Sequence, residues 1–398
     1  MSGIPSPAVA GSVDLSAVRR WLVDRRADLL AEIAEYVSIE TPSNSKPHLD
    51  QGLDWLTGRL NAVLGPPAAS ERFDGAEHGD TLVADFPGTG TRRLLVLCHY
   101  DTVWDAGTLD DWPFAVTDGI ARGPGVFDMK TGLVQALWAV RALDAAGLPR
   151  PPMRIVLNGD EELGSVSSRP FLEAASAGVT AALVLEPGVD GALKTARKGI
   201  GFFRVDVTGV EAHAGLDPEK GVSAIDELAR IVLALRALQD LGRGTSVNVG
   251  TIAGGTRNNV IAGHAHATID VRVTDPAEAD RVDAALAALT PTDRRLGITV
   301  GGGWNRPPMP RTPGIAAMVE LARALAGGLG EELGERAVGG GSDANFLAAL
   351  GVPLLDGLGA VGAGAHARDE HVDIDATVAR TALVAALIHA FALPEEGS

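Results

Sequence analysis

Residues 93–101 read RLLVLCHYD, so that five consecutive apolar residues run directly into a histidine, a tyrosine and an aspartate. An unbroken apolar run of this length is typical of a strand that is buried on both faces of a sheet. Three further strands are predicted nearby: 81–86, 153–158 and 181–185. Helices are predicted between them, at 132–146 and 169–176. The alternation of strands and helices over residues 80–186 predicts an α/β fold around a mixed, mostly parallel sheet.

The pattern differs on either side of this region. Apolar residues recur at helical spacing over residues 15–64, with a break at 42–47, which predicts two helices. Beyond residue 198, the strands and helices are predicted in the ferredoxin-like order βαββαβ, with the following ranges: 200–208, 221–241, 246–253, 265–274, 276–289 and 297–301. Gly-rich and Pro-rich stretches at 301–303 and 307–313 close this segment, after which helix–strand–helix alternation resumes. We therefore expect an α/β domain formed by residues 13–198 and 304–398, interrupted by an α+β domain over 199–303.

Composition excludes several classes of function. The chain has 398 residues, 34 Lys and Arg against 51 Asp and Glu, and a formal charge of −17. Binding to nucleic acid or to an anionic membrane needs clustered basic residues, which this balance argues against. Cys98 is the only cysteine, so no internal disulfide is possible. We expect a cytoplasmic protein whose first dozen residues form a loosely attached tail.

Acidic residues and a histidine follow the predicted buried strands. They lie where the strands end or on the Gly-rich loop at 123–128: His99, Asp101, Asp128, Glu161, Glu162 and Glu186. Each alone fits a structural role, such as a helix N-cap for Asp128 or a hydrogen-bonded core histidine for His99. Together, at one edge of a sheet, these carboxylates would repel one another without a cation. A pair of divalent metal ions relieves that repulsion, and histidine with carboxylates is the ligand chemistry of zinc or a similar ion.

These segments resemble the motifs of a known family. The motifs are HYDTV at 99–103, GPGVFDMKTG at 123–132, GDEELGS at 159–165, EPG at 186–188, EAHAG at 211–215, GGTRNNVIAG at 254–263, GGGSDA at 339–344 and GAGAH at 362–366. In this order they resemble the dinuclear-zinc aminoacylase and carboxypeptidase family over about residues 15–395. The similarity is greatest to the glutamate carboxypeptidase (folate-cleaving) branch, and acetylornithine deacetylase and succinyl-diaminopimelate desuccinylase are further members.

The resemblance implies a role for each residue of the metal site. It assigns His99 and Glu186 to one metal, Glu162 and His366 to the other, and Asp128 to both. Asp101 would orient the imidazole of His99, and Glu161 would be the general base. We reason that Glu161 and Glu162 lie in an extended segment, where adjacent side chains diverge. The family also has a cis peptide bond after the bridging aspartate, here Asp128–Met129.

The same resemblance implies substrate contacts and a dimer. His213 would donate to the oxyanion from a partner subunit, and Asn259 would assist across the dimer. Arg272 would bind a substrate carboxylate, although solvent-facing strand arginines are common. The loop around Gly340 and Ser342 would line the substrate pocket. The segment 199–303 would then be a lid and dimerisation domain of a homodimer.

Other candidates carry less specific signals. His264 and His266 alternate along one predicted strand, but no acidic partner pattern surrounds them, which favours ordinary surface positions. His371 competes with His366 as a ligand. Arg197 and Lys198 would either attract an anionic substrate or lie in a solvated hinge. Cys98 is expected in the core.

The sequence therefore predicts a metal-dependent hydrolase with two divalent ions, zinc or alternatively cobalt or manganese. Its expected substrate is a small peptide or N-acyl amino acid whose amide bond lies next to a free carboxylate. One alternative is deacetylation or desuccinylation of an amino acid by the same chemistry. Another alternative is a non-catalytic ligand-binding homologue. The presence of all five candidate metal ligands and of the candidate general base Glu161 argues against it.

Overall fold

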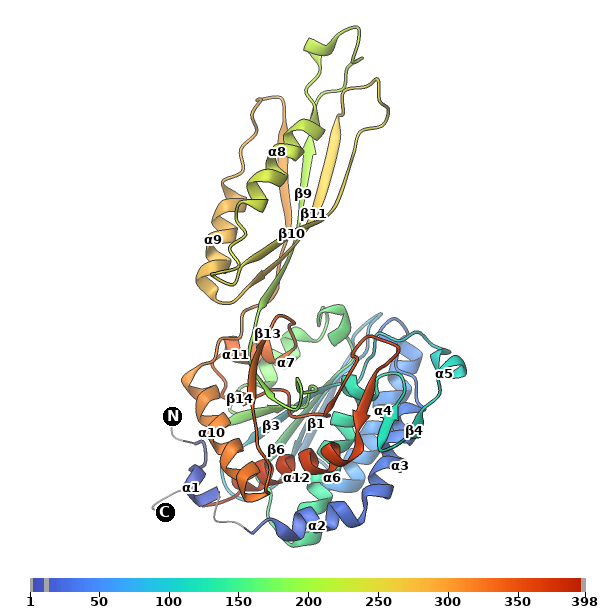
Figure 1. The fold of residues 1–398 in the computed structure, drawn as a ribbon, viewed down its shortest axis with the longest axis vertical. Helices are drawn as coiled ribbons and strands as arrows, with labels where there is room; N and C mark the ends of the chain where they lie inside the picture. The colour runs from blue at the N-terminus through green and yellow to red at the C-terminus, as the bar shows by residue number, and fades with distance from the viewer. Residues whose placement is uncertain (1–2, 11–13, 395–398) are drawn as a thin grey trace. The chain divides into compact units, whose positions relative to one another are not determined.

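The computed structural model describes residues 3–10 and 14–394, and these form two compact units. Unit 1 contains the residues up to Thr195, together with Arg311–Ala337 and the residues from Ser342 onward. Unit 2 contains Ala196–Pro310 and Val338–Gly341. Each unit has its own sheet and helices, many of which are labelled in Figure 1.

Unit 1 is built on a six-stranded mixed sheet with the order β1-β2-β6-β3-β7-β14. Its strands are β1 (Ala69–Phe73), β2 (Thr81–Phe86), β3 (Leu94–His99), β6 (Met153–Asn158), β7 (Ala181–Val184) and β14 (Leu354–Leu355). The strands β6, β3, β7 and β14 are parallel, and β2 and β1 join antiparallel at one side. Every residue of β3 is buried, as expected for a strand covered on both faces. The predicted α/β fold with a mixed, mostly parallel sheet is confirmed.

The helices of unit 1 pack on this sheet and on one another. They are α1 (Pro7–Ala10), α2 (Ser16–Asp24), α3 (Arg26–Val37), α4 (Lys46–Leu64), α5 (Thr108–Asp111), α6 (Thr131–Ala146), α7 (Arg169–Ala175), α10 (Pro313–Gly328), α11 (Ala344–Ala349) and α12 (Ile374–Ala390). In Figure 1, α6 and α12 lie on one side of the sheet and α7 and α11 on the other. Both α6 and α12 are apolar around most of their circumference, because α6 packs between β3 and other helices and α12 packs against α2, α6 and α10.

Two sequence predictions in the N-terminal region are wrong. Three helices, not two, occupy residues 15–64, because the backbone leaves helical geometry at Arg25. The apolar periodicity does not show this break, since Leu22 and Leu29 on either side are both buried. The expected loose tail is also not found in residues 3–10: Pro5 is buried, and α1 lies beside α10. Residues 1–2 and 11–13 of that tail lie outside the described residues.

Short strands complete the secondary structure. The strands β4 (Ala115–Thr117), β5 (Ile120–Arg122), β15 (Gly362–Ala363) and β16 (His371–Asp373) form a small antiparallel sheet in the order β15-β16-β5-β4. A two-stranded sheet joins β8 (Leu193–Arg197) and β13 (Glu335–Val338). Among the described residues, no helix combines the length and apolar character that a membrane-spanning segment requires.

Unit 2 is a four-stranded antiparallel sheet packed on two helices. Its elements follow the chain in the order β9 (Gly199–Thr208), α8 (Ala224–Arg236), β10 (Ser246–Gly254), β11 (His264–Val273), α9 (Pro276–Ala287) and β12 (Gly297–Arg306), and the sheet order is β10-β11-β9-β12. Alternate residues of β9 and β11, such as Val205 and Ala267, are buried in the core that these strands share with α8 and α9. The intervening residues point to the opposite, more exposed face.

The end of unit 2 differs from the sequence prediction. The glycines at 301–303 were expected to end the last strand, but β12 continues through them to Arg306, paired with β9. Gly302 has a φ of 89°, which glycine adopts without strain, so the strand passes through these residues while its pairing with β9 continues. Compact unit 2 therefore extends to Pro310, seven residues beyond the expected boundary at residue 303.

Candidate active site

The parallel strands of unit 1 bring the predicted acidic residues to one edge of the sheet. His99 is the last residue of β3, Glu161 and Glu162 come after β6, and Glu186 comes after β7. Asp128 lies in the turn Val126–Lys130 that leads into α6. The peptide bond between Asp128 and Met129 is cis, as the resemblance implies.

Five of the predicted residues form two groups that share one carboxylate. In the first group, His99 Nε2 lies 3.2 Å from Asp128 Oδ1 and 3.4 Å from Glu186 Oε1. In the second, His366 Nε2 lies 3.1 Å from Glu162 Oε2 and 3.4 Å from Asp128 Oδ2. The possible ligand atoms within each group lie within 4.8 Å of one another. The two oxygens of Asp128 thus face different histidines, an arrangement suited to a bridging ligand.

The charges of these side chains depend on one another. Hydrogen bonds with Asp128 and Glu162 raise the pKa of His366 to about 10. Burial raises the pKa of Glu162 to about 7, and the neighbouring charge of Asp128 acts in the same direction. Burial also opposes ionisation of Asp128, but His366 and His99 hold its pKa well below the usual range. Asp128 and Glu162 therefore depend on nearby positive charge to stay ionised.

The side chains fit a pair of divalent cations. Glu162 Oε1 is buried and has no hydrogen-bond partner among the described residues, although a buried carboxylate oxygen is costly to leave unsatisfied. A cation shared with His366 would satisfy that oxygen. Two imidazoles with carboxylates are also a donor set that zinc and related ions prefer. Both observations favour metal ligation at each of the two groups.

Asp101 connects His99 to the glutamate pair. It is fully buried, and its Oδ1 lies 3.4 Å from His99 Nδ1. Its two carboxylate oxygens accept the backbone N–H groups of Glu161 and Glu162, each at 3.1 Å. Asp101 therefore holds the backbone of both glutamates as well as facing the imidazole.

The glutamate pair does not lie in an extended segment, so that prediction is wrong. Glu161 and Glu162 begin a 3₁₀ turn, Glu161–Leu163, with Asp160 preceding it. Adjacent side chains still diverge, because a 3₁₀ helix has about three residues per turn. Glu161 is half-buried and close enough to influence the charge of His99.

Three of the predicted substrate residues lie in the segment Ala196–Pro310 of unit 2. His213 and Asn259 lie in adjacent segments, since the Ala214 amide donates to the Asn259 carbonyl at 3.0 Å. His213 is exposed, and its Nδ1 accepts the amides of Gly215 and Leu216, each at 3.1 Å. A neutral His213 therefore carries its proton on Nε2, which points to a role as a donor. Arg272 pairs with Asp270 at 3.0 Å on its own strand, and also donates to the Gly339 carbonyl at 3.3 Å.

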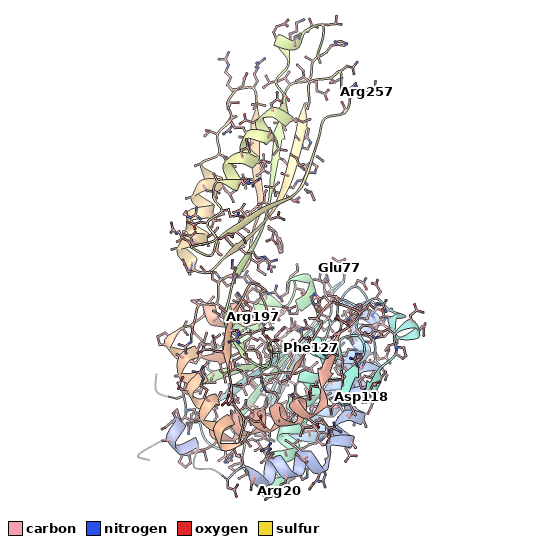
Figure 2. All side chains as sticks on the ribbon, in the orientation of Figure 1. Arg20, Glu77, Asp118, Phe127, Arg197 and Arg257 are labelled. Carbon is pink, nitrogen blue, oxygen red and sulfur yellow. The ribbon has the colours of Figure 1, made fainter. Side chains whose placement is uncertain are left out.

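The predicted glycine loop divides between the two units. Gly340 belongs to unit 2, where its carbonyl accepts from Arg197 at 3.2 Å. Ser342 belongs to unit 1 and is 1% exposed, and its amide donates to Asn345 Oδ1 at 2.9 Å. Arg197, labelled in Figure 2, is 4% exposed, so the alternative of a solvated hinge is wrong for this residue.

Comparisons with known proteins decide the family. The profile described as "Peptidase family M20/M25/M40" matches residues 95–390. The chain belongs to this peptidase family. The predicted family is therefore confirmed, and the protein is a metal-dependent hydrolase of the metallopeptidase and amidohydrolase type. Members of the M20 family generally bind two divalent metal ions, and the two groups that share Asp128 are candidate ligand sets.

The M20 relatives include the enzymes expected from the motifs. Carboxypeptidase G2 from Pseudomonas sp. (strain RS-16) is 30% identical over 379 residues, which cover 92% of this chain and 89% of that protein. A succinyl-diaminopimelate desuccinylase from Xanthomonas campestris pv. campestris (strain B100) is 30% identical, covering 76% of this chain and 84% of that protein. Among solved structures, aminopeptidase PepT from Bacillus cereus ATCC 10987 has a similar fold, with a TM-score of 0.76 and 23% identity, covering 92% of this chain and 99% of that one.

Glu370, which has no motif in the sequence, holds the turn that carries Asp128 in place. Glu370 is 0% exposed. Its Oε1 accepts the amides of Phe127 at 2.8 Å and Asp128 at 3.0 Å, and its Oε2 accepts the Gly125 amide at 2.9 Å and the Trp104 indole N–H at 2.8 Å. Figure 2 shows Phe127 inside unit 1. In the sequence, Glu370 is recognisable only as an acidic residue four positions after His366. That spacing does not show which backbone amides donate to its carboxylate.

The other histidines considered from the sequence, and Cys98, lie outside the two groups that share Asp128. His371 is outside both groups, and its Nδ1 lies 2.7 Å from the Asp369 carbonyl. Cys98 is buried, as expected for a core residue, and burial raises the pKa of its thiol. The prediction that His264 and His266 have no acidic partner is wrong, because Asp206 on the neighbouring strand lies 3.3 Å from His264 Nε2.

Proposed function

We propose that this M20 protein hydrolyses an amide bond next to a free carboxylate, as a carboxypeptidase or an N-acyl-amino-acid amidohydrolase. The observation that carries the proposal is the pair of His–carboxylate groups that share Asp128, with Glu161 directly beside the ligand candidate Glu162. The resemblance to the glutamate carboxypeptidase branch and the similarity to carboxypeptidase G2 over 92% of the chain favour this substrate class.

We assign His99, Asp128 and Glu186 to one cation and Asp128, Glu162 and His366 to the other. Zinc suits this set of imidazoles and carboxylates best, with cobalt or manganese as substitutes. When bound, the two cations polarise the scissile carbonyl and make water a stronger nucleophile. The backbone carbonyl of Asp101, 3.1 Å from His99 Nδ1, and its carboxylate, 3.4 Å from the same atom, keep His99 oriented so that Nε2 faces Asp128 and Glu186.

Glu161 serves as the general base and then as the general acid. It takes a proton from the attacking water and returns that proton to the nitrogen of the leaving amine. The hydrogen bond from its amide to Asp101 fixes the backbone at this position.

Residues of unit 2 complete the proposed chemistry. His213 donates a hydrogen bond through Nε2 to the oxyanion that develops on the substrate, and the two amides on its Nδ1 support this tautomer. Arg272 binds the substrate carboxylate, and Asn259 and the backbone around Gly340 and Ser342 contribute to the substrate site. In the family resemblance, His213 and Asn259 act across a dimer, so we propose a homodimer joined by unit 2. We also propose a cytoplasmic location, consistent with a single cysteine, Cys98.

A second candidate function uses the same site. Deacetylation or desuccinylation of an amino acid has the same bond cleavage, and the desuccinylase that is 30% identical to this chain favours it. The two functions differ in which part of the substrate is recognised. The two functions can be distinguished by measuring hydrolysis of a panel of N-acyl amino acids and dipeptides in which the acyl part and the amino acid part are varied separately. The part of the substrate that the enzyme recognises is the one whose variation changes kcat/KM most.

Replacement of Glu161 by glutamine tests the catalytic role directly. We expect Glu161→Gln to lose at least 100-fold in kcat in the zinc-loaded protein while its metal content stays equal to that of the wild type. Glu77→Gln is the matched control, because the Glu77 side chain is 89% exposed on unit 1. Full activity in Glu161→Gln would refute the assignment of the base, and a loss of bound metal would show that Glu161 is instead a ligand.

A further inference from the structure

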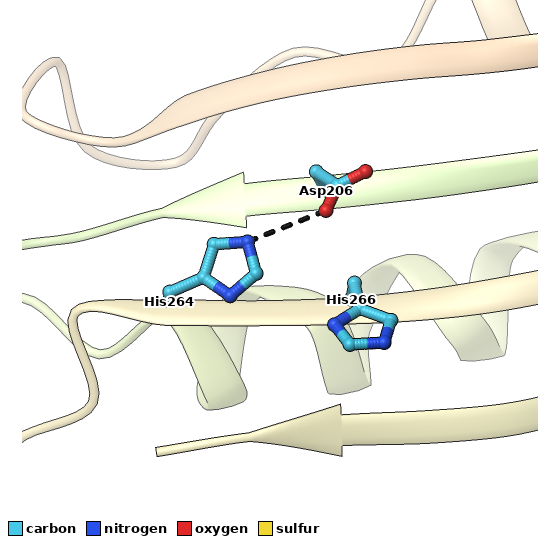
Figure 3. Close-up of side chains that lie close together, drawn as sticks. All are labelled: Asp206, His264 and His266. Atoms are coloured by element: carbon cyan, nitrogen blue, oxygen red, sulfur yellow. Dashed lines mark hydrogen bonds and ion pairs between the residues drawn. The ribbon is translucent and has the colours of Figure 1, made fainter. Parts of the chain in front are cut away.

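A second kind of His–carboxylate cluster lies in unit 2, on the face of the sheet opposite α8 and α9. His264 and His266 are on β11, and Asp206 is on β9, directly opposite His266 in the antiparallel register. Since side chains two residues apart on a strand point to the same face, both imidazoles project toward Asp206. Figure 3 shows these three side chains together.

The geometry of this cluster resembles a ligand set. One possible ligand atom from each of the three side chains lies within 4.8 Å of the other two. His264 Nε2 is 3.3 Å from Asp206 Oδ1, and the two imidazole centroids are 5.7 Å apart. His266 Nδ1 is buried and has no hydrogen-bond partner among the described residues. A buried ring nitrogen without a partner is costly, and a cation would satisfy it.

We propose that His264, His266 and Asp206 form a binding site for a divalent cation of the zinc or copper type. Two imidazoles and a carboxylate are the donors these ions prefer, and water can supply the remaining positions because the His264 side chain is 54% exposed. The ion would connect β9 to β11 and stabilise unit 2. This site goes beyond the proposed function, because none of its residues belongs to the catalytic set.

Arg204 competes with the cation for Asp206. Its Nε and an Nη donate to the two carboxylate oxygens at 2.7 Å and 2.9 Å. The guanidinium also adds a positive charge beside the cluster. A bound cation must therefore share or displace this ion pair, which is itself weak because the Arg204 side chain is 45% exposed. Removal of the arginine should consequently tighten cation binding.

Zinc binding by the full chain tests the site. Wild type and the double variant His264→Asn, His266→Asn are equilibrated with buffered free Zn²⁺, and zinc per chain is measured. We expect the double variant to bind one zinc fewer, with amidohydrolase activity unchanged. His78→Asn on unit 1 is the matched control and should bind as much as the wild type. Because the result is a difference between chains, it does not depend on how many ions unit 1 holds. Equal zinc content in the wild type and the double variant would overturn the proposal.

Further measurements exclude indirect effects. The metal-free double variant should have the circular dichroism and thermal midpoint of the metal-free wild type, and in the wild type added Zn²⁺ should shift the imidazole proton resonances of His264 and His266. Arg204→Gln should lower the zinc dissociation constant of this site at least 3-fold. A dissociation constant that is unchanged or higher, or imidazole resonances that stay in place, would contradict the assignment.

Discussion

Replacement of Glu370 by glutamine tests how the turn that carries Asp128 is held. Each oxygen of the Glu370 carboxylate accepts two hydrogen bonds, Oε1 from Phe127 and Asp128 and Oε2 from Gly125 and Trp104. Glutamine keeps one oxygen and replaces the other by an NH₂ group, which can only donate. In either orientation of the amide, two of the four hydrogen bonds are therefore lost. The two N–H groups that donated them then face the NH₂ group of glutamine, which cannot accept.

The expected loss follows from these bonds. A hydrogen bond to a charged group contributes about 1.5–3 kcal/mol, so losing two predicts a decrease of about 3 kcal/mol or more in the free energy of unfolding. Water cannot replace the missing acceptor, because Glu370 is 0% exposed. Since the Asp128 amide is one of the donors, we also expect metal affinity to fall by about 10-fold or more.

Urea unfolding of the metal-free proteins measures the first effect, and competition with a zinc chelator measures the second. Asp369→Asn is the matched control, because it removes the same charge from an exposed carboxylate one residue earlier. It should stay within about 0.5 kcal/mol of the wild type. A Glu370→Gln variant that unfolds and binds zinc like Asp369→Asn would refute the role of Glu370 in positioning the turn.

Three other predictions concern the same unit. Removal of metal with a chelator should abolish hydrolysis, and added zinc or cobalt should restore it; full activity in metal-stripped protein would contradict a metal-dependent reaction. Asp101→Asn should weaken zinc binding by about 10–100-fold, measured in zinc buffers against the exposed control Asp105→Asn, because Asp101 faces His99 Nδ1. The ion pair with Arg154 lowers the pKa of Asp85 in the folded protein. The ion pair therefore stabilises the folded state by about 1 kcal/mol at pH values above about 3.9, the pKa of Asp85 in the unfolded chain. This stabilisation is lost as the pH falls through the lower pKa of Asp85 in the folded protein. The difference in unfolding free energy between wild type and Asp85→Asn should therefore shrink from pH 7 to pH 3, and a constant difference would contradict it.

The sequence predicted the parts of the fold that depend on local pattern. The apolar run before His99 is a fully buried strand, and the residues that follow β3, β6 and β7 do meet at one edge. Parallel strands align their carboxyl ends, so a strand assignment is enough to bring His99, Glu162 and Glu186 near one another. His366, which lies in a loop, could be placed only through the family motif.

Features that depend on contacts between distant segments could not be predicted. The glycines of β12 read as a strand end, although pairing with β9 continues the strand. Asp206 lies beside His264 and His266 only because of the antiparallel register of β9 and β11, which the sequence does not show. Glu370 acts on amides more than 240 residues earlier in the chain, and backbone amides leave no mark in a sequence.

The most direct test of the dinuclear site is anomalous diffraction from crystals of the zinc-loaded protein, measured on both sides of the zinc absorption edge. We expect two peaks in unit 1, one contacted by His99 and Glu186, the other by Glu162 and His366, with Asp128 contacting both. A single peak, or two peaks of which only one contacts Asp128, would contradict the shared-carboxylate site on which the proposed hydrolysis depends.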